Sequence, residues 1–204
     1  ALPTILTAED HLELRRFIRD SLGASYQYIE PTGGIEALAL ATSHIPDLVI
    51  SDVMMPEMDG LELCKRIKNQ DATSHIPFIL LTARADQEDK LEGLENGADD
   101  YLTKPFSVHE LRIRIKNILH SRKILQKRYQ MPFQLALKDK SKENTYLVKI
   151  EALIRSRTTD PEFGVERLAQ ILLLSTAQLN RKIKAITGQT TVLFIQNIKM
   201  QMAL

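Results

Sequence analysis

The stretch that decides the fold runs from Asp47 to Gly60 and reads DLVISDVMMPEMDG. Its apolar run stops at Ser51 and Asp52 and gives way to a turn rich in Pro, Asp and Gly. This pattern predicts a buried strand that delivers the carboxylate of Asp52 to a loop. Ligands of open α/β sheets bind beyond the carboxyl ends of the strands. Asp52 is therefore expected at the edge of the sheet where functional residues lie. Because Asp is also a common turn residue, Asp52 alone does not decide between the two roles.

Other apolar segments also end in polar side chains: Ile5–Leu6 leads to Glu9 and Asp10, Phe78–Leu81 to Thr82, and Asp100–Thr103 to Lys104. If these strands are parallel neighbours, their carboxyl ends surround one shallow pocket. Crowded carboxylates repel one another unless a cation joins them, and a site of oxygen ligands suits Mg²⁺. Thr82 and Lys104 supply a hydroxyl and a positive charge that would hold a phosphoryl group on Asp52. The sequence therefore predicts an acidic Mg²⁺ site at which an aspartate is phosphorylated.

These motifs resemble the receiver domain of response regulators in two-component signalling. The resemblance rests on motifs that occur in the family's order, namely Glu9–Asp10, the Asp52–Pro56–Gly60 loop, Thr82–Ala83 and Lys104–Pro105–Phe106. It implies that Asp52 accepts a phosphoryl group from a histidine kinase and that Thr82 and Lys104 assist the transfer. The kinase would lie on the same polypeptide if the chain is part of a hybrid system.

The resemblance also implies a metal site and a switch. Asp10, Asp52 and the backbone carbonyl of Met54 would hold Mg²⁺, and Glu9 would act through water. Thr82 and Tyr101 would form the switch that responds to phosphorylation, and the phosphorylated protein would form a homodimer. Glu9 stands where the family usually has Asp, a change that should leave Mg²⁺ binding intact.

Strands and helices alternate along the first part of the chain, as a parallel sheet requires. The expected helices cover His11–Leu22, Ile35–Ser43, Leu61–Asn69 and Gln87–Asn96, and a short strand covers Tyr26–Ile29. A last helix begins at Val108 and runs without a breaker towards Tyr129. The receiver resemblance implies a flavodoxin-like, doubly wound α/β fold with a five-stranded parallel sheet.

The net charge of +1 over 204 residues conceals a division of the chain. Residues 1–120 carry 12 basic and 20 acidic side chains, a net charge of −8, while residues 121–204 carry 15 and 6, a net charge of +9. Such asymmetry favours a nucleic-acid partner for the basic part. The single cysteine, Cys64, lies on the apolar side of an expected helix and is interpreted as a buried hydrophobe. Without a membrane span or a signal peptide, the chain is expected to be cytoplasmic and to make no membrane contact.

A helix-turn-helix is predicted in the basic part, after a helix expected at Tyr146–Arg157. Helix Val165–Leu172 precedes a short connection, and Ser175 is the expected N-cap of a helix over Thr176–Ile186. The segment resembles the first helix-turn-helix of an AraC-type DNA-binding domain, although Leu173 and its neighbours replace the usual Gly of the turn. The DNA-facing residues would be Thr176, Ala177, Gln178, Asn180, Arg181 and Lys184, with Arg181, Lys182 and Lys184 as phosphate contacts.

We therefore expect a receiver domain over residues 1–122, an extended helix and linker over 123–145, and a partial all-α AraC-type domain over 146–204. The predicted linker includes the polar stretch Lys138–Asn144. The segment Phe194–Leu204 would lie within the helix that connects to a second helix-turn-helix. Together these parts predict a phosphorylation-controlled transcription regulator rather than an enzyme.

Two alternatives remain. An aspartyl-nucleophile phosphatase also uses Asp, Mg²⁺, Thr and Lys, but it needs a second Asp two residues after the nucleophile as general acid, and Met54 stands there. The other alternative is a receiver that signals through protein contacts only, with the helix-turn-helix as an interaction module. A DNA mobility-shift assay separates this alternative from transcription control.

Overall fold

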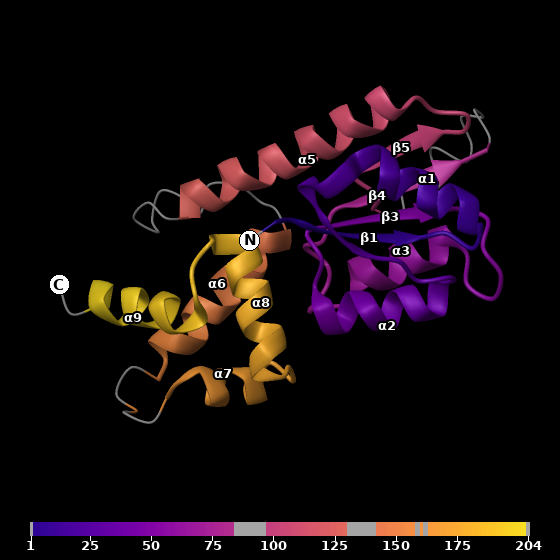
Figure 1. Ribbon diagram of the computed structural model, residues 1–204. Helices are drawn as coiled ribbons and strands as arrows, with labels where there is room; N and C mark the ends of the chain where they lie inside the picture. Colours follow the sequence, from indigo (N-terminus) through magenta and orange to yellow (C-terminus); the bar gives the residue numbers. More distant parts are fainter. Residues whose placement is uncertain (1, 84–96, 130–141, 158–159, 161–162, 203–204) are drawn as a thin grey trace. The chain divides into compact units, whose positions relative to one another are not determined.

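The computed structural model describes residues 2–83, 97–129, 142–157, 160 and 163–202 (Figure 1). The chain divides into two compact units, Ala1–His120 and Ser121–Leu204. The first unit contains a sheet with helices on both faces, and the second unit is helical. The first unit has a hydrophobic core on each face of its sheet, and the second unit has a core of its own.

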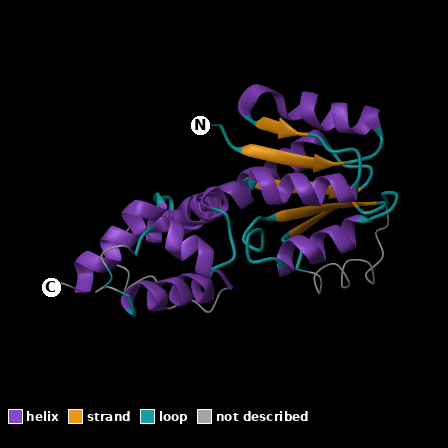
Figure 2. Cartoon of the chain, turned by 90° about the horizontal axis from the view of Figure 1, so that it is seen from below, coloured by secondary structure: helices purple, strands orange, loops and turns teal. Residues whose placement is uncertain are grey.

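The sheet of the first unit has five parallel strands in the order β2-β1-β3-β4-β5. Figure 2 shows the strands of the sheet in orange, with helices in purple around them. This arrangement confirms the predicted flavodoxin-like fold. The strand bounds are β1 Thr4–Ala8, β2 Gln27–Ile29, β3 Leu48–Asp52, β4 Phe78–Thr82 and β5 Asp100–Thr103. The strand order reverses at β1, because β2 lies on one side of it and β3 to β5 lie on the other. A crevice for ligands is expected at the carboxyl ends next to such a reversal.

Helices cover both faces of the sheet. Their bounds are α1 Leu12–Leu22, followed by the short 3₁₀ helix η1 Gly23–Ser25, then α2 Gly34–His44, α3 Gly60–Asn69 and α5 Val108–Tyr129. These bounds agree with the predicted helices to within one residue at each end. The helix predicted at Gln87–Asn96 lies outside the described residues.

Successive residues of the central strands face two different cores. Val49 belongs to the core under α2 and α3, whereas its neighbours Leu48 and Ile50 belong to the core under α1 and α5. In β4 the residues Phe78 and Leu80 face the first core, and Ile79 and Leu81 face the second. Both faces of β3 and β4 are therefore buried, which explains why these strands read as continuous apolar runs.

The second unit consists of α6 Lys142–Arg155, α7 Val165–Ile171, α8 Thr176–Thr187 and α9 Thr191–Met202. Buried side chains from all four helices form its core, among them Ile150, Leu168, Ile183 and Ile195. Helix α6 begins at Lys142, four residues before the predicted start. The end of the predicted linker, residues 142–145, is thus helical, because Lys and Glu are good helix formers and a polar stretch need not interrupt a helix. Linker residues 138–141 lie outside the described residues.

The turn between α7 and α8 is closed without a glycine. Leu174 donates its backbone N–H to the carbonyl of Ala169 (3.0 Å), and Leu173 donates to Gln170 (3.1 Å). This hydrogen-bond pair is a Schellman motif, which requires a left-handed residue after the helix. Leu173 takes that conformation, with φ of 55°, and its side chain is 92% exposed.

Helix α8 begins with the N-cap that the sequence predicts. The Ser175 hydroxyl accepts a hydrogen bond from the backbone N–H of Gln178, and the Gln178 side chain accepts one from the N–H of Ser175. This reciprocal capping box fixes the first turn of α8. No helix among the described residues is long and apolar enough to cross a membrane.

Candidate functional site

Three carboxylates meet at the carboxyl edge of the sheet. One carboxylate oxygen each from Glu9, Asp10 and Asp52 lies within 4.8 Å of the others. Glu9 and Asp10 follow β1, and Asp52 ends the neighbouring β3, so the parallel pairing of these strands brings the acids together. Asp10 is exposed, whereas Glu9 and Asp52 are buried. A cluster of carboxylate oxygens with one exposed member is a donor set that fits Mg²⁺.

Lys104 brings a positive charge to this cluster from the end of β5. Its Nζ lies 2.9 Å from Oδ1 of Asp52 and 3.2 Å from Oε2 of Glu9. The backbone N–H of Lys104 donates to the carbonyl of Thr82 (2.7 Å), which continues the pairing of β4 and β5 beyond the strands. The strand ends thus place Lys104 close enough to contact a group bound to Asp52.

Glu9 is completely buried and is held by three donors. Its carboxylate accepts a hydrogen bond from the backbone N–H of His11 (3.0 Å) in addition to the contact with Lys104. Its backbone carbonyl accepts a hydrogen bond from the guanidinium of Arg15. Burial raises the pKa of the Glu9 carboxyl, while the His11 hydrogen bond and the Lys104 charge oppose this rise.

The loop after β3 depends on a close approach at Gly60. A Cβ atom there would lie 2.1 Å from the carbonyl oxygen of Asp52, much closer than such atoms approach one another. The N–H of Gly60 donates to the carbonyl of Val53 (2.9 Å), and the N–H of Val53 donates to Leu81 in β4 (2.9 Å). The loop is thus folded tightly against the strand that carries Asp52, while the side chain of Met54 is 73% exposed.

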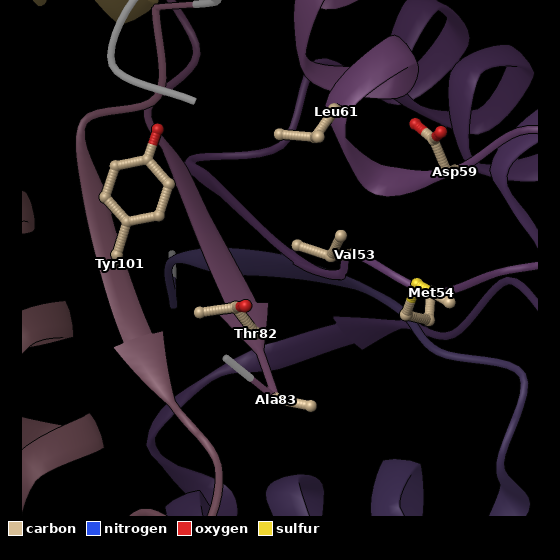
Figure 3. A pocket seen from close by; sticks show the side chains of 7 residues that line it. All are labelled: Val53, Met54, Asp59, Leu61, Thr82, Ala83 and Tyr101. Atoms are coloured by element: carbon tan, nitrogen blue, oxygen red, sulfur yellow. The ribbon is translucent and has the colours of Figure 1, made fainter. Parts of the chain in front are cut away.

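Thr82 and Tyr101 line a cavity of about 440 Å³ beside the acidic cluster. Figure 3 shows Thr82 and Tyr101, from β4 and β5, facing Val53 and Leu61 across it, with the Tyr101 hydroxyl directed away from Thr82. The Tyr101 hydroxyl is buried and has no hydrogen-bond partner among the described residues. Burial raises the pKa of Tyr101 to about 12. The partly buried ring of Tyr101 thus lies against a cavity that it shares with Thr82.

In the helical unit, most of the predicted DNA-facing residues of α8 are exposed: Thr176, Ala177, Asn180, Arg181 and Lys184. Gln178 is partly buried, and its side-chain oxygen is engaged in the capping box. The expectation that Lys182 contacts phosphate is wrong, since this residue is 1% exposed. Its Nζ lies 3.7 Å from the centroid of the Tyr146 ring, where the positive charge is attracted to the ring face. Lys182 therefore belongs to the core, three residues after Leu179 on the same apolar stripe.

Comparison with known proteins identifies the first unit. Residues 5–116 match the family described as "Response regulator receiver domain". The chain belongs to this family. The hydrogen bond from Arg15 to the backbone carbonyl of Glu9 was not predicted, because a contact with a backbone carbonyl leaves no sequence motif.

A curated relative matches the receiver domain and the helical unit together. "Histidine kinase P4" of Formosa agariphila is 42% identical over 205 residues, which cover 98% of this chain and 15% of that protein. The chain thus spans a small part of the length of that relative. A segment similar to this receiver and the helices after it thus occurs within a protein named as a histidine kinase.

Two solved receiver domains are similar to about 59% of this chain. The signal receiver domain of a signal transduction histidine kinase from Syntrophus aciditrophicus is 39% identical, with a TM-score of 0.56, over 59% of this chain and 92% of that one. The receiver domain of the sensor histidine kinase PA1611 from Pseudomonas aeruginosa PAO1 is 30% identical, with a TM-score of 0.55, over 59% and 99%. The latter was solved with a magnesium ion coordinated in its active site cleft.

Proposed function

We propose that Asp52 is the phosphoacceptor of this receiver domain and that a histidine kinase is the phosphodonor. The observation that carries the proposal is the meeting of Asp52 with two further carboxylates and with Lys104, 2.9 Å away, at the carboxyl edge of the sheet. A carboxylate oxygen of Asp52 would form a bond to phosphorus while the bond between phosphorus and the donor nitrogen breaks. The bonding electrons leave with the donor, and Lys104 and Thr82 hold the transferred group.

We further propose that the cluster holds Mg²⁺ through Asp10, Asp52 and the carbonyl of Met54, with Glu9 acting through water. The donor set of the described cluster consists of carboxylate oxygens, which Mg²⁺ prefers. The magnesium ion in the PA1611 receiver supports the same assignment here. A bound Mg²⁺ would neutralise part of the negative charge that three carboxylates and a phosphoryl group bring together.

Mass spectrometry of the intact chain tests the phosphoacceptor. Incubation with acetyl phosphate and Mg²⁺ should add the mass of one phosphoryl group, and the addition should disappear without Mg²⁺ or in Asp52→Asn. Asp59→Asn is the matched control, because Asn retains the N-cap that the Asp59 side chain gives to α3. Phosphorylation of the Asp52→Asn variant would refute the assignment.

For the helical unit we propose the first half of an AraC-type DNA-binding domain, controlled by the receiver. The support is the capped helix α8 after a tight turn, with Asn180, Arg181 and Lys184 exposed on it. Arg and Asn can read base edges, and Lys contacts phosphates. The match to "Histidine kinase P4" supports a place for both units in a hybrid two-component protein.

DNA binding can be tested by fluorescence anisotropy on this chain and on a longer one that continues beyond Leu204. One helix-turn-helix inserts a single helix, so the present chain should bind promoter DNA weakly and with a shallow salt dependence. The longer chain should bind more tightly, and each further phosphate contact should steepen the salt slope by about 0.9. Equal affinity and slope would refute the two-part domain.

A specific feature favours the protein-contact alternative as a second candidate. Leu173, in the turn before α8, is 92% exposed and is therefore accessible to a protein partner. If the longer chain shifts no DNA in a mobility assay while still responding to phosphorylation, this alternative replaces DNA binding.

A further inference from the structure

The side chain of Arg15 is an unusual feature beside the acidic cluster. Arg15 lies in α1 and is only 8% exposed, although arginine is rarely buried without a partner. Among the described residues, no carboxylate forms an ion pair with it. Its contact is the hydrogen bond that its guanidinium donates to the backbone carbonyl of Glu9. Burying this cation is costly, so its position calls for a reason other than helix packing.

The accepting carbonyl belongs to the peptide group that joins Glu9 to Asp10. This peptide group is planar, so a hydrogen bond at its oxygen fixes the direction in which the chain leaves Glu9 and enters Asp10. Asp10 is exposed, and no side chain in the described part of the chain forms a hydrogen bond or ion pair with its carboxylate. The orientation of Asp10 toward Asp52 therefore depends on the backbone that carries it.

Electrostatics alone would not favour an arginine at this place. A positive charge near a divalent-cation site repels the incoming cation. The benefit of Arg15 must then be geometric, and it must outweigh this repulsion.

We propose that Arg15 is a positioning residue of the divalent-cation site: its guanidinium anchors the Glu9–Asp10 peptide and so holds the two acids at the separation from Asp52 that Mg²⁺ requires. This inference rests on the proposed Mg²⁺ site. Groups that orient metal ligands in other proteins typically change metal affinity about 10- to 100-fold when they are removed. A loss of this size is expected here.

The test measures Mg²⁺ affinity of the unphosphorylated chain by NMR titration. Arg15→Met should weaken binding about tenfold or more. Arg15→Lys keeps the charge but loses the planar fork, and should give an intermediate affinity. The matched control is Arg16→Met, which removes the same charge from the exposed neighbouring position and should bind as the unaltered chain does. Thermal unfolding without metal measures stability separately.

The outcomes distinguish this inference from the function on which it rests. Unchanged affinity in Arg15→Met, with only a lower unfolding temperature, would mean a purely structural role and would overturn the inference. Tighter binding would mean that charge repulsion outweighs positioning, which overturns it as well. If Arg15→Met fails to fold, the Arg15→Lys affinity decides in the same way. Failure of the unaltered chain to bind Mg²⁺ would remove the proposed metal site and the inference together.

Discussion

Gly60 is the residue on which the geometry of the phosphoacceptor loop depends. Since a Cβ atom at this position would meet the Asp52 carbonyl, Gly60→Ala should shift the loop and displace Asp52 from Lys104. Overpacking of this kind costs about 1–3 kcal/mol. We expect lower stability in urea unfolding and slower phosphorylation by acetyl phosphate.

Gly33→Ala is the matched control, because a Cβ atom at Gly33 meets no atom within 4 Å and the residue has extended backbone angles. Its loss of stability should be limited to the preference that an N-cap has for Gly over Ala, and its phosphorylation rate should be unchanged. Equal losses in both variants would show that the close approach to Asp52 is unimportant.

The reactivity of the Cys64 thiol should depend on pH and on unfolding. The thiol is completely buried, and burial raises its pKa to about 12. Because only the thiolate reacts with disulfide reagents, the native chain should remain almost unreactive at pH 8 and should react fully in denaturant. Colorimetric titration with Ellman's reagent checks this. Rapid reaction of the native chain at pH 8 would show that α3 opens readily.

At the scale of elements, the Schellman turn between α7 and α8 contains a residue that is poorly suited to it. A left-handed conformation costs a residue with a side chain about 1–2 kcal/mol, whereas Gly adopts it freely. Gly gains about 0.4–1 kcal/mol more freedom in the unfolded chain. Leu173→Gly should therefore stabilise the helical unit by about 0–1.6 kcal/mol, the difference between these two effects.

Hydrogen exchange of the α8 amides in the intact chain would measure this gain as slower opening. Leu173→Ala is the control, since it removes the exposed side chain but retains Cβ and the strain. If the two variants are equally protected, any gain in stability comes from the loss of exposed apolar surface and not from relief of the left-handed backbone.

The elements themselves could largely be predicted from the sequence. The apolar runs around Val49 and Leu80 identify strands buried on both faces, and the Ser175 capping signal marks the start of α8 correctly. The positions of acidic residues at the carboxyl ends of the strands also predicted which carboxylates would meet, because parallel strands end at one edge of the sheet.

Contacts that depend on tertiary packing could not be predicted in this way. From its residue type, Lys182 was expected to face solvent. Its spacing from Leu179 and Ile186, however, places it on the buried stripe of α8 and could have indicated burial. The attraction of its ammonium group to the ring of Tyr146, which is distant in sequence, offsets part of the cost of its burial. The left-handed conformation of Leu173 could not be predicted either, since Leu has no preference for that conformation.

For the whole molecule, α5 is the element that belongs to both units, because it begins at Val108 and ends at Tyr129 beyond the boundary at His120. A continuous helix transmits orientation better than a flexible linker does.

We expect beryllium fluoride, a phosphoryl mimic, to cause dimerisation through the receiver in the presence of Mg²⁺. Light scattering measures the mass, and Asp52→Asn with the same additives is the control. An unchanged mass together with unchanged DNA affinity would refute the coupling.

The alternation of β3 between two cores also limits how its coding sequence can vary. A substitution at Val49 disturbs one core at one point. Deletion of a single codon between Val49 and Ser51 would instead move each later side chain of the strand to the opposite face and would turn Asp52 away from Lys104. Point changes in this strand should therefore be tolerated far more often than insertions or deletions, which should be confined to surface loops.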